Sequence, residues 1–126
     1  MELAKEVYDI IPIDKESLPE RFDIDLGDEP FTMQANYNET GDFFTIDLFK
    51  TGDEGEDVDF IMGEKLVLGR ALWADVPRVD LPAPTLIPLD IGMKAKRVSF
   101  DNFGESVFLY IADGSGEDDN VDDGTD

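Results

Sequence analysis

Alternating apolar and polar positions between residues 31 and 49 predict two antiparallel strands joined by a compact turn. The first run is Phe31–Tyr37, the turn is Asn38–Asp42 and the second run is Phe43–Phe49. Because successive side chains of a strand point to opposite faces, we expect each run to bury every second residue. The second run also carries Phe43 and Phe49 on its other face, where exposed aromatic rings would need a partner.

Shorter patterns elsewhere predict further strands. Arg21–Leu26 alternates cleanly, whereas Val58–Met62 and Lys65–Leu68 are expected as two separate short strands. Ser106–Ile111 is nearly continuously apolar, which is typical of a central strand covered on both faces. About seven strands and no helical pattern of about ten residues predict an all-β fold. We expect a single small antiparallel β-sandwich or a partly open barrel.

Prolines mark the expected edges of this fold. Val7–Ile13 is rich in strand-forming residues, but Pro12 cannot donate a ladder hydrogen bond, which places the segment at an edge or a strand end. Pro77–Pro88 contains four prolines and should run extended across a surface. Leu86–Asp90 is expected to rejoin the core at its edge. Val98–Phe103 is the one stretch that suggests a helical turn.

Charge adds a second strong feature, because 31 acidic residues against 10 basic ones give a net charge of −21. Residues 112–126 hold seven of the acids and no base, so we expect a folded domain over residues 1–111 and a disordered acidic tail over 112–126. So acidic a surface repels phosphate backbones and anionic lipids, and direct binding to nucleic acid or membrane is not expected. No apolar run approaches about 20 residues, and the N-terminus does not resemble a secretory signal.

The missing residue types narrow the chemistry further. The sequence has no histidine and no cysteine, which removes the commonest general base, the commonest transition-metal ligand and every thiolate. No glycine-rich phosphate loop is present, and we expect neither an enzyme nor a cofactor. Asp118, Asn120 and Asp122 match the first three ligand positions of a calcium loop, but Asp123 stands where glycine is required. A solvated acidic tail is the favoured interpretation, with no metal site.

Five segments resemble the phage baseplate plug family of small tail proteins from contractile-tailed phages and related prophages. They are Phe22–Gly27, Tyr37–Leu48, Gly63–Gly69, Leu86–Asp90 and Asn102–Ile111. The resemblance implies an all-β, non-enzymatic structural protein at the centre of the baseplate. It implies packing against baseplate hub and tail tube-end proteins, and a contribution to closing the tail channel. Neither the acidic tail nor the acidic loop at residues 53–57 belongs to the family pattern.

The expected location is therefore the virion tail baseplate, with assembly in the host cytoplasm and several copies in each baseplate. Two other function classes remain open, an acidic DNA-mimicking inhibitor and a calcium-dependent binding module. Phe43 and Phe49 are equally expected to be covered by a second sheet or by Pro77–Pro88, or to lie at an interface. The same two alternatives, cover by the chain or an interface, apply to Trp73. The candidate interface residues are Asn38, Gly41, Asp42, Phe43, Phe49 and Trp73.

Overall fold

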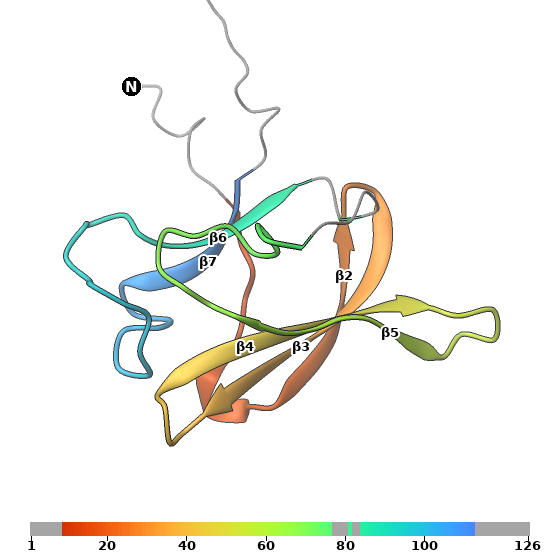
Figure 1. Ribbon diagram of the computed structural model, residues 1–126, viewed down its shortest axis with the longest axis horizontal. Helices are drawn as coiled ribbons and strands as arrows, with labels where there is room; N and C mark the ends of the chain where they lie inside the picture. The colour runs from red at the N-terminus through yellow and green to blue at the C-terminus, as the bar shows by residue number, and fades with distance from the viewer. Residues whose placement is uncertain (1–8, 77–80, 82–83, 113–126) are drawn as a thin grey trace, which may run out of the picture.

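Two antiparallel sheets make up the computed structural model, which describes residues 9–76, 81 and 84–112 (Figure 1). The first sheet has the strand order β2-β3-β4-β5 and the second has the order β1-β7-β6. The sheets do not close into a barrel, and the expected all-β fold of about seven strands is confirmed. The elements are β1 Asp9–Ile10, the 3-10 turn η2 Lys15–Ser17, β2 Glu20–Leu26, β3 Glu29–Asn38, β4 Phe43–Thr51, β5 Asp57–Lys65, β6 Thr85–Asp90 and β7 Val107–Ala112.

The β3–β4 hairpin follows the predicted alternation. Tyr37 pairs with Phe44 near the turn, and Met33 pairs with Leu48 farther along the strands. The inward side chains are almost inaccessible, with Met33, Ile46 and Leu48 all at 0% exposure. They form one core together with residues of the second sheet, so burial of this face holds the two sheets together.

A two-residue turn joins β2 to β3. Gly27 and Asp28 have φ angles of 62° and 69°, and positive values at both positions define the type I′ turn that matches the twist of a hairpin. Glycine and aspartate tolerate this region better than most residues. The turn fixes the register of β2, so that Phe22, Ile24 and Leu26 face inward.

Strand β5 differs from the prediction. Instead of two short strands at Val58–Met62 and Lys65–Leu68, one strand runs through Asp57–Lys65, and Leu66 lies just beyond it. The pairing register with β4 shifts twice, as at a β-bulge, and Gly63 within this region has a φ of 72°. Glycine therefore allows the strand to bend and continue where the pattern predicted a break.

The second sheet agrees with the predicted centre and edge. Strand β7 lies between β1 and β6, and β6 contains Pro88 at an edge position. A loop segment covers the outer side of β6. Gly69 N donates to Pro88 O at 2.7 Å, and Leu72 N donates to Leu86 O at 2.8 Å. This cover protects the sheet edge from pairing with another chain.

Two further predictions concern the N-terminal run Val7–Ile13 and the helical turn at Val98–Phe103. In the described part of the N-terminal run, residues 9–13, the strand covers Asp9–Ile10, which is paired at the edge of the sheet, and Pro12 lies beyond its end. Near Ser99 the chain makes a single turn, in which Phe103 N donates to Ser99 O at 2.9 Å, and no helix follows. Residues 77–80 and 82–83 of the proline-rich segment, and the tail after Ala112, lie outside the described residues.

Candidate interaction surface

The structure brings four of the six candidate residues together at the β3–β4 turn, which we call the hairpin tip (residues 38–43). Asn38 and Gly41 are exposed, whereas Asp42 and Phe43 are partly buried. Asn38 Oδ1 accepts a hydrogen bond from Gly41 N at 2.9 Å, and this side-chain bond closes the turn. The tip is therefore an ordered, solvent-facing surface.

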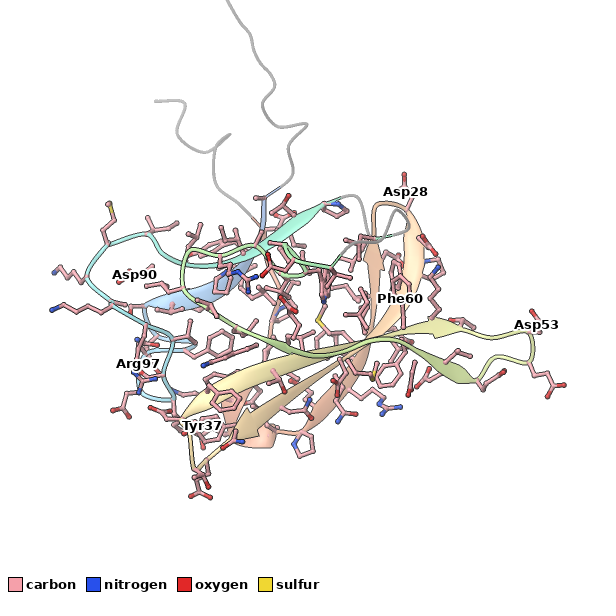
Figure 2. The ribbon with its side chains drawn as sticks, viewed as in Figure 1. Asp28, Tyr37, Asp53, Phe60, Asp90 and Arg97 are labelled. Carbon is pink, nitrogen blue, oxygen red and sulfur yellow. The ribbon has the colours of Figure 1, made fainter. Side chains whose placement is uncertain are left out.

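One carboxylate ties the tip to a distant loop. Asp42 Oδ1 accepts from Tyr37 Oη at 2.7 Å and from Phe100 N at 2.9 Å, and Asp42 Oδ2 accepts from Arg97 Nη2 at 2.5 Å. Figure 2 shows Tyr37 and Arg97 at the same corner of the molecule. Asp42 itself has a φ of 55°, a conformation that aspartate tolerates more readily than most side chains.

These contacts shift the ionisation of both partners in opposite directions. The hydrogen bond from Tyr37, followed by those from Phe100 and Arg97, lowers the pKa of Asp42 to about 2. The same hydrogen bond to Asp42 is the main reason that the pKa of Tyr37 rises to about 12. At neutral pH Asp42 is therefore a charged acceptor and Tyr37 is a neutral donor. This combination allows the hydroxyl of Tyr37 to donate to the carboxylate of Asp42.

An aromatic cluster supports the tip from beneath. The ring of Tyr37 lies 4.9 Å from that of Phe44 and 5.0 Å from that of Phe100, and Phe44 lies 4.7 Å from Phe103. Lys15 adds a cation 4.7 Å above the ring of Phe100. Packing from three parts of the chain thus holds the tip in one arrangement.

Phe43 lies on the outer face of β4 beside the tip. Lys65 Nζ lies 4.7 Å from the centre of its ring, so a cation from the neighbouring strand covers part of it. A Cβ added at Gly41 would lie 2.5 Å from Phe43 Cε2, which means that glycine leaves room for the ring. Phe43 keeps part of its surface open to solvent.

Phe49 is buried, which agrees with the expected alternative that another part of the chain covers it. Its exposed fraction is 6%. The guanidinium of Arg21 lies 4.3 Å from the ring centre, and it is itself held by Gln34 Oε1 at 2.8 Å and Asp57 Oδ2 at 2.9 Å. A side chain of a strand in the same sheet therefore covers the ring.

Trp73 is part of the core rather than the surface, with an exposed fraction of 4%. Its φ is 61°, and its backbone N donates to Glu64 Oε2 at 2.7 Å. The indole Nε1 is buried and has no acceptor among the described residues. Phe49 and Trp73 thus lie apart from the hairpin tip as buried side chains.

The sequence profile of the family described as "Cyanophage baseplate Pam3 plug gp18" matches residues 8–114. The chain belongs to this baseplate plug family. No curated protein matches the sequence. Membership in the plug family gives the chain a structural role in a phage tail baseplate, and the matched range contains strands β1 to β7 and the hairpin tip.

Sequence reasoning missed the partners that hold the tip of this plug-family chain. Arg97 and Phe100 lie 55 and 58 positions from Asp42, and no local pattern signals a contact at that separation. A charge signal was available, because Lys94, Lys96 and Arg97 place three of the chain's ten bases within four residues. That cluster stands out in so acidic a sequence.

The described residues contain no group of three or more acidic, histidine or cysteine side chains arranged to hold a metal ion. The calcium-like segment at Asp118–Asp126 lies outside the described residues. Within the part of the chain that the structure describes, no helix is long and apolar enough to cross a membrane.

Proposed function

We propose that this chain is a non-enzymatic component at the centre of the baseplate, where it packs against hub and tail tube-end proteins and helps to close the tail channel. The match of residues 8–114 to the baseplate plug family is the observation that supports this role. Several copies serve each baseplate, and assembly takes place in the host cytoplasm. The acidic surface keeps free subunits apart and soluble before they dock.

The proposed contact surface is the hairpin tip, with Asn38, Gly41, Asp42 and Phe43. Hydrogen bonds to Asp42 and the aromatic cluster hold this surface in place before any partner binds. A rigid surface loses little conformational entropy on docking, and a partly exposed aromatic ring is a common anchor of protein interfaces. Phe49 and Trp73 contribute by supporting the sheets that carry the tip.

Gly41→Ala tests this surface. The new Cβ would meet the Phe43 ring at 2.5 Å, so the ring must rotate, while the core beneath stays unchanged. We expect a folded protein with a thermal midpoint close to the natural one, but reduced incorporation into tails. Incorporation is measured by quantitative mass spectrometry of purified particles. Ser106→Ala, an exposed change outside the tip, is the control.

Normal incorporation of Gly41→Ala would contradict the assignment of the tip as the contact surface. Recovery of the natural chain with a basic nucleic-acid-binding protein, and its absence from purified tails, would contradict the baseplate role. That second result would favour the DNA-mimicking inhibitor.

A further inference from the structure

Two protruding segments lie at opposite ends of the molecule. The first is the loop of residues 91–97 after β6, which we call the basic loop; the second is the β4–β5 hairpin end of residues 51–59, which we call the acidic arm. Figure 1 shows the loop at the left and the arm at the right of the longest axis. In Figure 2, Asp90 and Arg97 mark the two ends of the loop and Asp53 marks the tip of the arm.

The basic loop combines apolar and cationic side chains. Ile91 and Met93 are 62% and 88% exposed, which makes them the most exposed large hydrophobic side chains among the described residues. Lys94 and Lys96 are exposed beside them, and neither ammonium forms an ion pair with a described residue. Exposed apolar residues ringed by charge are typical of a protein interface.

The conformation of the basic loop is set before any partner binds. The carboxylate of Asp90 accepts from Gly92 N and Lys94 N at 2.9 Å and from Ala95 N at 2.7 Å. Met93 N donates to Asp90 O at 2.9 Å, and Met93 has a φ of 61°. A loop held in this way presents its side chains at low entropic cost.

The acidic arm carries the complementary groups. Asp53 and Glu54 are exposed on it, and Val58 adds an apolar side chain that is 43% exposed. The turn itself is ordered, because Gly52 N donates to the backbone O of Glu56 at 2.8 Å. The arm thus offers carboxylates next to one exposed apolar side chain, and the loop offers ammonium groups next to two exposed apolar side chains.

We infer that the basic loop of one copy docks on the acidic arm of a second copy, head to tail. Ile91 and Met93 would pack beside Val58, while Lys94 and Lys96 face the carboxylates of the arm. Loop and arm lie at opposite ends of the molecule, so one copy does not satisfy both surfaces by itself (Figure 1). Such a heterologous contact builds a ring where the rotation closes, and a filament where it does not.

This inference goes beyond the proposed baseplate role and does not depend on it, since the purified chain alone tests it. The net charge of −21 opposes association at low salt, and high salt weakens the ion pairs of the contact. At physiological ionic strength the screening length is about 8 Å, so long-range repulsion fades while direct contacts persist. Association is therefore expected to be strongest at intermediate salt.

Zero-length carbodiimide crosslinking tests the contact directly, because it joins only an amine and a carboxylate that touch. Equal amounts of ¹⁵N-labelled and unlabelled chain are mixed at intermediate salt, and mixed-isotope peptides are identified by mass spectrometry. We expect links from Lys94 or Lys96 to Asp53 or Glu54. Links that run mainly to acids of residues 113–126, or no mixed-isotope links from these lysines, would overturn the inference.

Charge reversal gives an independent measurement by sedimentation velocity. Lys94→Glu/Lys96→Glu and Asp53→Lys/Glu54→Lys should each weaken self-association about tenfold. The four changes in one chain should restore it, because the two surfaces are complementary again and the net charge returns to −21. Lys5→Glu/Arg78→Glu, which matches the net charge of the first variant at positions outside the loop and the arm, should weaken association much less. Failure of the fourfold variant to recover would contradict the inference.

Discussion

At the residue scale, the shape of the hairpin tip depends on Asp42. Its carboxylate accepts hydrogen bonds from a tyrosine hydroxyl, a backbone amide and a guanidinium group. The alternation of residues 31–49 predicts the turn that carries Asp42. The alternation cannot predict the hydrogen bonds that Asp42 accepts from Arg97 and Phe100, because these donors approach Asp42 only when the chain is folded.

Asp42→Asn should destabilise the protein near neutral pH. The pKa of Asp42 is lowered from 3.8 to about 2 in the folded state. Its stabilising contribution is therefore fully present above pH 3.8 and is lost as the pH falls through about 2. The difference in thermal midpoint between the natural chain and Asp42→Asn, measured by circular dichroism, should shrink across that window.

Glu39→Gln is the matched control, since it removes an exposed carboxylate from the same turn. It should leave the midpoint nearly unchanged at every pH. Equal changes in thermal midpoint for the two variants would contradict the stabilising role of the Asp42 carboxylate. So would a midpoint difference for Asp42→Asn that does not change with pH.

At the scale of the element, β4 carries two neighbouring aromatic residues with opposite environments. Phe44 is 1% exposed within the aromatic cluster, whereas Phe43 lies on the outer face beneath Lys65. Phe44→Ala should reduce the free energy of unfolding by about 3–5 kcal/mol, because it leaves a cavity in the core. Phe43→Ala should cost much less, and urea unfolding of both variants measures the difference. Similar losses would contradict the assignment of the two faces.

The elements also show how far the sequence reaches. Period-two alternation predicts β3 and β4, and an almost continuous apolar run predicts the central position of β7. The continuity of β5 depends on a bulge and the positive φ of Gly63, which periodicity does not reveal. The cover of Phe49 depends on Arg21 from another strand, and the burial of Trp73 on tertiary packing. Alternation assigns a face, but it does not say what lies over that face.

At the scale of the whole molecule, charge is the dominant property. Among the residues that the structure describes, four bases lie over aromatic rings, namely Lys15, Arg21, Lys50 and Lys65. These cations cover aromatic surface within the chain, whereas Lys94 and Lys96 remain exposed. The distribution of the few bases is therefore as informative as the large net charge.

Removal of residues 117–126 should leave the thermal midpoint unchanged or slightly raised. The deletion takes away six acids and no base, which reduces repulsion within the chain. The rise of the midpoint with added sodium chloride should also become smaller. Differential scanning calorimetry measures both effects, with a tail of the same length in Asn and Gln as the control. A large fall in midpoint would show that the tail stabilises the fold.

The proposed place of this chain is the centre of the baseplate. An electron-microscopy map of the intact tail tip at side-chain resolution tests it most directly. We expect density for this two-sheet fold at the centre of the baseplate, with the hairpin tip against hub or tube-end proteins. A map of complete tails whose centre is filled by other chains, with this fold absent or confined to the periphery, would contradict it.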